Sequence, residues 1–278
     1  MPARDSSLPI AMFDSGVGGL TVLHECLVSL PNEDFVYLGD TARFPYGNRD
    51  ANELREFALE LAELLIEEGA KLLVVACNSA TAAALPLLRA ELAGRIAVVA
   101  VVEPEARLAG ATTKNGHVGL LATPATVASG AYERALRERA PGATLHAVAC
   151  PKLAPMIQAG EHFDQDLVDA VEDYCAPLKH AGVDTVILGC THYPLVRPIL
   201  QRALGRGVTI VSSGEAIADA VQKELVDGPG ESDPGRRGSY RFLCTGDPEA
   251  FRAIGTRFLQ MPLGEVRQVE VRGARRAA

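Results

Sequence analysis

The sequence contains no tryptophan, few lysines and no two cysteines in a C-x-x-C arrangement. Without such pairs it lacks the cysteine spacing of a common zinc or dithiol redox site. In a cytoplasmic chain of this size, cysteines are expected to be free thiols. A buried free thiol usually acts as a small apolar side chain, and that is our expectation for Cys26, Cys175 and Cys244.

The chain also lacks any apolar run near the roughly 18 residues that a membrane helix needs. Its first residues, MPARDSSLPIAMFDSG, show no long apolar stretch ending in a small-residue cleavage site. The net charge of −8 and the pI of about 5.3 disfavour a general affinity for nucleic acids or acidic membranes. We therefore expect a cytoplasmic protein whose partners are neither nucleic acids nor membranes.

The common cofactor motifs are missing as well. Gly16 and Gly18 begin a dinucleotide fingerprint, but its third glycine would stand at position 21, which is Thr21. The sequence has no phosphate-binding G-x-x-x-x-G-K-[ST] loop and no H-E-x-x-H zinc motif, and no lysine follows a strand in a way that suggests a Schiff base. We expect the protein to work without a cofactor.

Apolar segments typical of buried strands alternate with amphipathic helical patterns, and 278 residues suffice for one large domain or two ordinary ones. Expected strands lie at 9–14, 34–40, 71–76, 95–104, 144–151 and 184–190, expected helices lie at 20–30, 51–69 and 166–182, and residues 117–127 read as strand, turn and helix start. Continuous apolar strands between amphipathic helices predict a parallel sheet covered on both faces. Pro86 predicts a break in the helix after residue 77.

The pattern of the first half restarts near residue 117, which is a weak internal repeat. Asp14 and Thr123 each follow the first strand of a half, and Cys77 and Cys190 stand at similar distances after them. We expect an α/β protein of two similar lobes, each a parallel-rich sheet flanked by helices, with the active site in the cleft between them. Beyond the repeat, residues 226–239 predict an exposed loop, 240–246 an edge strand and 272–278 a frayed tail.

Polar clusters stand where the expected strands end, which is where open parallel sheets bind ligands. The clusters contain Asp14 and Ser15, Asp40 with Tyr46 and Gly47, Cys77 with Asn78 and Ser79, and Cys190 with Thr191 and His192. Each cluster has an ordinary interpretation, such as a helix cap or a turn. Together, with a cysteine in two of them, they are better explained by a site.

Cys77 and Cys190 each follow a strand and precede an expected helix. Backbone N–H groups and the helix dipole at such a junction favour a thiolate, so we expect a lowered pKa for both thiols. Two thiols on opposite walls of one cleft could remove a proton from one face of a carbon and return a proton to the other. That reaction inverts a stereocentre without a cofactor.

At these residues the sequence resembles the cofactor-independent glutamate racemases of the aspartate/glutamate racemase superfamily. The matching motifs are DSGVGGL, YLGDTARFPYG, ACNSAT, ACPKLAPMIQAGE and GCTHYPL, in that order over most of the chain. The resemblance implies that a second lobe, residues 100–211, is inserted into a first lobe of residues 1–99 and 212–278. It also implies interconversion of L- and D-glutamate, which supplies D-glutamate for peptidoglycan and so for the bacterial cell wall and cell shape. A homodimer is possible.

The same resemblance implies roles for individual residues. Cys77 and Cys190 would be the catalytic acid/base pair. Substrate would bind at Asp14, Ser15, Tyr46, Gly47, Asn78, Ser79, Thr191 and His192, with Thr123 and Thr126 as weaker candidates. Ser79 stands where the family usually has threonine and keeps the hydroxyl. Gln158 stands where the family has an acidic helper residue, and its neutral amide leaves that role open.

Three other functions are compatible with parts of the pattern. One is a racemase for aspartate or another amino acid. Another is a cysteine hydrolase or transferase in which His192 activates Cys190, although residues so close in sequence rarely face each other well, and Cys77 would have no role. The third is a two-lobed amino-acid-binding protein without catalysis, against which the paired cysteines argue.

Overall fold

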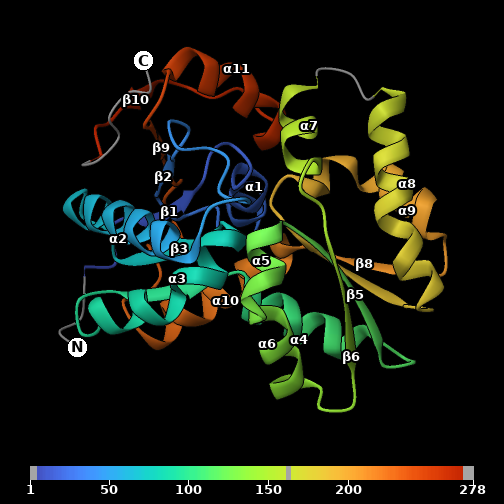
Figure 1. Ribbon diagram of the computed structural model, residues 1–278. Helices are drawn as coiled ribbons and strands as arrows, with labels where there is room; N and C mark the ends of the chain where they lie inside the picture. The colour runs from blue at the N-terminus through green and yellow to red at the C-terminus, as the bar shows by residue number, and fades with distance from the viewer. Residues whose placement is uncertain (1–4, 161–163, 272–278) are drawn as a thin grey trace.

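The computed structural model describes residues 5–160 and 164–271 of the chain. Two separate parallel sheets lie side by side, and helices flank each of them (Figure 1). The predicted fold class, two α/β lobes with parallel sheets, is confirmed. None of the helices in the described ranges combines the length and the apolar character that a membrane span requires.

The larger sheet has six strands in the order β10-β9-β2-β1-β3-β4, and all of its pairs are parallel. Its strands are β1 (Ile10–Asp14), β2 (Phe35–Gly39), β3 (Leu72–Val75), β4 (Ala97–Ala100), β9 (Tyr240–Cys244) and β10 (Val266–Gln268). Strands from the two ends of the sequence therefore share one sheet, and Figure 1 shows them in blue to teal and in orange to red. Helices α1 (Leu20–Ser29), α2 (Ala51–Glu67), α3 (Asn78–Glu91) and α11 (Pro248–Leu259) pack against this lobe.

Buried residues of β1 alternate between the two faces of this sheet. Ile10 and Met12 belong to the hydrophobic cluster that includes α1, whereas Ala11 and Phe13 belong to the cluster that includes α2 and α3. All five residues of β1 are buried, as expected for a central strand covered on both faces.

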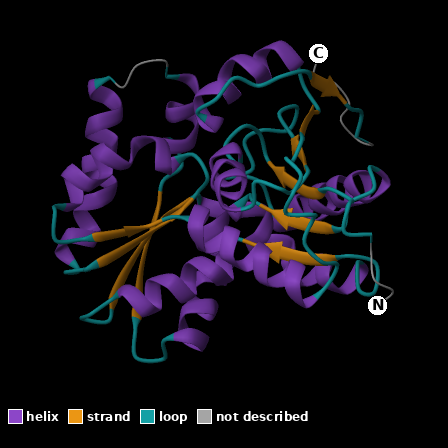
Figure 2. Ribbon diagram, turned by 180° about the vertical axis from the view of Figure 1, so that it is seen from behind, coloured by secondary structure: helices purple, strands orange, loops and turns teal. Residues whose placement is uncertain are grey.

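The smaller sheet has four parallel strands in the order β6-β5-β7-β8. Its strands are β5 (His117–Ala122), β6 (Thr144–Ala149), β7 (Thr185–Gly189) and β8 (Thr209–Val211). Its helices are α5 (Pro124–Ser129), α6 (Ala131–Arg139), α7 (Leu153–Ala159), α8 (Gln165–His180), the 3₁₀ helix η1 (Tyr193–Val196) and α9 (Arg197–Leu204). Figure 2 shows the two sheets as separate groups of strands, seen from behind.

Two helices carry the chain between the sheets. Helix α4 (Val102–Thr112) follows β4 of the larger sheet and packs on α6 and β7, and α10 (Ser213–Asp227) follows β8 of the smaller sheet and packs on α1 and α4. The loops that follow β1, β2, β3, β5, β6 and β7 meet between the lobes, as the shared lining of the cavity described below shows.

The structure corrects three expectations about elements. Residues 95–104 are not one strand, because β4 ends at Ala100 and α4 begins at Val102. An apolar run does not by itself distinguish a strand from a buried helix, and Pro104 is tolerated in the first turn of α4. Residues 240–246 do not form an edge strand, because β9 pairs with both β2 and β10.

Pro86 does not break the helix that follows Cys77, because α3 runs through it from Asn78 to Glu91. The side chain of Arg55 donates a hydrogen bond to the carbonyl of Ala83 in the turn before the proline. The predicted tail at 272–278 lies outside the described residues.

Candidate active site

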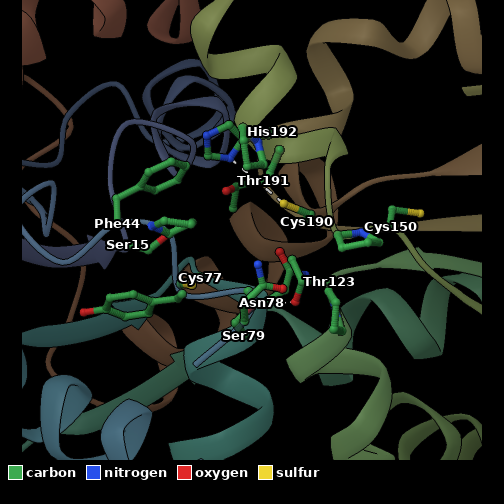
Figure 3. Close-up of a pocket in the computed structure, with 18 residues that line it drawn as sticks. Ser15, Phe44, Cys77, Asn78, Ser79, Thr123, Cys150, Cys190, Thr191 and His192 are labelled. Atoms are coloured by element: carbon green, nitrogen blue, oxygen red, sulfur yellow. Dashed lines mark hydrogen bonds between the residues drawn. The ribbon is translucent and has the colours of Figure 1, made fainter. Parts of the chain in front are cut away.

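A small cavity of about 30 Å³ lies between the two lobes. Its walls are the segments that follow strand ends of both sheets, so residues far apart in the sequence face one another across it (Figure 3). The lining residues are Ser15, Phe44, Pro45, Tyr46, Gly47, Asn48, Cys77, Asn78, Ser79, Thr123, Pro124, Cys150, Pro151, Ala154, Pro155, Cys190, Thr191 and His192.

The cavity is lined by the predicted catalytic pair and by the predicted substrate-binding residues, except Asp14 and the weaker candidate Thr126. Asp14 lies fully buried at the end of β1, where its carboxylate accepts hydrogen bonds from the backbone N–H of Gly16 at 3.1 Å and the hydroxyl of Thr191 at 3.4 Å. Burial raises the pKa of Asp14, and hydrogen bonds from Gly19, Gly16 and other groups lower it in part. Asp14 thus supports the wall of the cavity from behind.

Cys77 follows β3 and caps the N-terminus of α3, where its sulfur accepts a hydrogen bond from the N–H of Ala80 at 3.5 Å. Burial and, next, the charge of Asp14 raise the pKa of the Cys77 thiol to about 12. The expectation of a lowered pKa is therefore wrong for the free protein. The helix N-terminus does favour the thiolate here, but the loss of solvation outweighs it.

Cys190 follows β7 on the opposite side of the cavity from Cys77 (Figure 3). Burial raises its pKa well above the ordinary value, so the expected lowering is wrong here too. A one-turn 3₁₀ helix, not an α-helix, comes next in the chain, so the dipole at Cys190 is small. The nearest ring nitrogen of His192, Nδ1, lies 4.0 Å from the sulfur.

His192 is buried between two aromatic rings. The centroid of its imidazole lies 5.5 Å from the ring centroid of Phe44 and 5.0 Å from that of Phe258. Burial, together with the positive charge of Arg257, lowers the pKa of His192 to about 3, so the imidazole is neutral. Its Nε2 lies 2.9 Å from the side-chain oxygen of Gln158. Because that oxygen only accepts, Nε2 carries the proton and the lone pair of Nδ1 faces Cys190.

The loop after β2 contributes Tyr46 and Gly47. The hydroxyl of Tyr46 donates to Asp40, so the site receives the backbone of this residue and not its hydroxyl. Gly47 permits close contact between the lobes, because a Cβ there would lie 2.9 Å from the Cβ of Thr123. The carbonyl of Gly47 accepts a hydrogen bond from the N–H of Ala125 at 2.9 Å across the cleft.

A cluster of hydroxyl groups also joins the two walls. The Ser79 hydroxyl lies 2.9 Å from that of Thr123 and 3.3 Å from that of Thr126. Thr123 lines the cavity, whereas Thr126 contacts Ser79 and Thr123 from behind. These are the residues that the sequence had indicated as weaker candidates.

Sequence reasoning gave no site role to several lining residues, which are Phe44 and Asn48 beside Tyr46, Pro124 after β5, and Cys150, Pro151, Ala154 and Pro155 after β6. The motif ACPKLAPMIQAGE contains the residues after β6, so that motif was the available signal. The sulfur of Cys150 points away from the middle of the cavity (Figure 3) and donates to the carbonyl of Val148. Within the described ranges, no three His, Cys, Asp or Glu side chains form a group that could hold a metal ion.

Comparisons with known proteins give a consistent family. Residues 22–221 match the family described as Asp/Glu/Hydantoin racemase. The chain is 44% identical to a glutamate racemase of Beutenbergia cavernae, over 96% of this chain and 95% of the relative. A crystal structure of a glutamate racemase isoform from Bacillus anthracis superposes with a TM-score of 0.89 at 37% identity, over 97% and 99% of the two chains. A glutamate racemase of Francisella tularensis, solved in complex with D-glutamate, gives a TM-score of 0.87 at 30% identity, over 96% and 98%.

Proposed function

The chain belongs to the glutamate racemases of the Asp/Glu/Hydantoin racemase family, and from this premise we propose that it interconverts L- and D-glutamate with two cysteines and no cofactor. The observation that carries the proposal is the pair Cys77 and Cys190 on opposite sides of one cavity (Figure 3). An amino-acid racemase needs one group to remove the α-proton and another to supply a proton on the opposite face.

The proposed reaction balances in one proton-transfer cycle. The thiolate of Cys77 takes the α-proton of D-glutamate, so that the C–H bond breaks, an S–H bond forms and the electron pair remains on the α-carbon. The thiol of Cys190 then gives its proton to the opposite face, which yields L-glutamate and a Cys190 thiolate. The reverse reaction begins with that thiolate, so each cysteine is the base for one enantiomer and the acid for the other.

Burial keeps both thiols protonated before substrate enters, as their raised pKa values indicate. The α-ammonium of glutamate brings a positive charge into the cavity, and a nearby positive charge favours a thiolate. We propose that one thiol gives its proton to solvent as the substrate binds. His192, neutral and with its Nδ1 facing Cys190, assists the proton transfers at that cysteine.

The polar groups of the cavity suit a zwitterionic dicarboxylic acid. The side-chain oxygen of Asn78 is buried and has no hydrogen-bond partner among the described residues, so it can accept from the ammonium. The first N–H groups of α3 and the hydroxyl of Ser15 can donate to carboxylates, and the hydroxyls of Ser79 and Thr191 can do so by exchanging their present partners, Thr123 and Asp14. Because carboxylate partners at fixed positions penalise a shorter acid, glutamate is expected to be turned over faster than aspartate.

Chiral analysis tests this function directly. Enzyme dialysed exhaustively against a chelator, without added pyridoxal phosphate or metal, should convert either enantiomer of glutamate to the racemate. In deuterated water the product should carry deuterium at the α-carbon. Activity that only an added metal or pyridoxal phosphate restored would contradict the proposal, and equal turnover of aspartate would contradict the choice of glutamate.

Substitution of the cysteines tests the mechanism. Cys77→Ala and Cys190→Ala should each abolish racemisation in both directions, because every turnover uses both residues. Cys150→Ala is the matched control, since this cysteine lines the same cavity but its sulfur points away. Near-normal racemisation by either of the first two variants would contradict the two-base mechanism.

In the cell we propose that the enzyme supplies D-glutamate for peptidoglycan, as the resemblance implies. Depletion of the protein in its host should then stop growth or distort cell shape, and D-glutamate in the medium should restore both. Failure of D-glutamate to rescue growth would speak against this role while leaving the chemistry untouched.

A further inference from the structure

A fully buried carboxylate that takes no part in the proposed chemistry lies behind Asn78. It belongs to Glu105, in the first turn of α4, and it is 0% exposed. Desolvation by burial raises its pKa to about 7, against the lowering effect of hydrogen bonds from its neighbours Ser213, Tyr132 and Asn78. An apolar side chain would fill this position without the cost of desolvating a carboxylate, so packing alone does not explain it.

Three elements other than α4 donate to this carboxylate. Its Oε2 accepts from the amide of Asn78, on α3, at 3.2 Å and from the hydroxyl of Tyr132, on α6. Its other oxygen accepts from the hydroxyl of Ser213, on α10. Glu105 therefore stands where the larger lobe, the smaller lobe and both connecting helices meet.

The hydrogen bonds of Asn78 leave its amide a single orientation. The amide nitrogen donates to Glu105 at 3.2 Å and to the hydroxyl oxygen of Tyr132 at 2.7 Å, and these two acceptors lie beside each other because Tyr132 is itself hydrogen-bonded to Glu105. The rotated amide would place its oxygen against the carboxylate, where two acceptors repel each other. With the amide nitrogen held on this side, the side-chain oxygen is turned away from Glu105, and it is buried and has no partner among the described residues, in a residue that lines the cavity.

We infer that Glu105 is a positioning residue, which holds the side-chain oxygen of Asn78 ready to accept a hydrogen bond from the α-ammonium of the substrate. This inference rests on the proposed function, because it takes an amino acid as the ligand. It assigns no proton transfer to Glu105, which touches Asn78 and not the cavity. Both enantiomers of glutamate carry the ammonium, so Glu105 has the same role in both directions of racemisation.

Two ligands separate this role from general support of the fold. D-glutamate carries the ammonium, whereas glutarate has both carboxylates and lacks it. Glu105→Leu replaces the accepting carboxylate with an apolar side chain of similar size. We expect this variant to bind D-glutamate about tenfold more weakly, which is the usual effect of losing a hydrogen bond to a charged group. Glutarate binding should change less than twofold. KM should rise about as much for both enantiomers, and kcat should change little.

Two further variants serve as rescue and control. Glu105→Gln keeps one oxygen to accept from Asn78, while its amide can donate to the Ser213 hydroxyl, so it should restore most of the D-glutamate affinity. Glu103→Leu changes a half-exposed glutamate on the same helix, paired with Arg89, and should leave the binding of both ligands unaffected. Circular dichroism and the glutarate affinity show that each variant is folded.

Calorimetric titration with the two ligands and steady-state kinetics decide the matter. Equal weakening of D-glutamate and glutarate in Glu105→Leu, or unchanged binding of both, would overturn the positioning role. A wild-type enzyme that did not racemise glutamate would instead overturn the proposed function, and the positioning role with it.

Discussion

At the scale of single residues, the site depends on charge states that burial sets. His192 is neutral because it is buried among aromatic rings and lies near Arg257. Its Nε2, the ring nitrogen farther from Cys190, donates a hydrogen bond to the side-chain oxygen of Gln158. A carboxylate at position 158 would instead favour the imidazolium, by placing a negative charge at hydrogen-bond distance from the ring. The side chain at position 158 therefore shifts the balance between a neutral and a charged histidine beside Cys190.

We expect assigned NMR spectra of the wild-type enzyme to show no protonation of His192 between pH 8 and pH 5, since its pKa is lowered to about 3. Gln158→Glu should raise that pKa by about 1–3 units, as an adjacent opposite charge usually does. Gln158→Met, which is uncharged, is the control and should keep the pKa low. A wild-type His192 that titrated near pH 6 would contradict the neutral state.

The sequence predicted which residues line the cavity better than it predicted the protonation of their side chains. Cys77, Asn78, Cys190 and Thr191 stand directly at strand ends, and their place in the cavity follows from local pattern and from the family motifs. The raised pKa values of the two thiols depend instead on how completely the opposite lobe excludes water. That is a tertiary property, and no spacing in the sequence encodes it.

At the scale of elements, one carboxylate holds a turn against a neighbouring strand by hydrogen bonds. Asp184 precedes β7 and binds the turn between α4 and β5: its carboxylate accepts from the hydroxyl of Thr113 at 2.7 Å and from the N–H groups of Lys114 and Asn115 at 2.7 and 2.8 Å. These hydrogen bonds, with one from Thr185, outweigh desolvation and lower the pKa of Asp184 to about 2.

Because the folded protein lowers this pKa, the carboxylate contributes stability that is present above pH 4 and is lost as the pH falls toward 2. Asp184→Asn should lower the free energy of unfolding by about 1–3 kcal/mol at pH 7, since it removes hydrogen bonds to a charged group. The difference from wild type should shrink as the pH approaches 2. Urea unfolding at several pH values measures it, with Asp173→Asn, at an exposed position on α8, as the control.

Helices and strands were predicted correctly where the apolar residues recur with a clear period. Their bounds were predicted wrongly where that period is missing. The helix at Ala51–Glu67 follows a regular apolar pattern and begins at the capping box of Asp50 and Glu53. The run at 95–104 has no such pattern, so the end of β4 and the start of α4 were merged into one strand. Gln158 and Glu105 act through contacts between elements, and Glu105 looks in the sequence like an ordinary acidic residue of a first helical turn.

At the scale of the whole molecule, the two lobes close tightly over the site. The cavity of about 30 Å³ has room for only a few water molecules, at roughly 10–15 Å³ of such volume for each. Because its walls belong to different lobes, we expect the lobes to move apart as glutamate enters and to close again over it. The internal repeat predicted two lobes, whereas the return of the C-terminal segment to the first sheet was expected only from the family resemblance.

Arg257 holds the lobes together at the edge of this closure. It lies on α11 of the larger lobe and donates hydrogen bonds to the carbonyls of Ile157, Gln158 and Gly160, at the end of α7 in the smaller lobe. Figure 1 shows α11 and α7 beside each other at the top of the molecule. The guanidinium therefore satisfies carbonyls that the end of a helix leaves without intrahelical partners.

Arg257→Ala should favour separated lobes, because the closed arrangement then loses three hydrogen bonds between them. We expect a larger radius of gyration of the free enzyme in small-angle X-ray scattering and a KM raised about equally for L- and D-glutamate. Saturating D-glutamate should return the radius toward that of the wild type, because a ligand that binds the closed form stabilises it. Arg252→Ala, on the same helix and paired with the nearby Glu249, is the matched control. An unchanged radius together with an unchanged KM in Arg257→Ala would show that the lobes close without this contact.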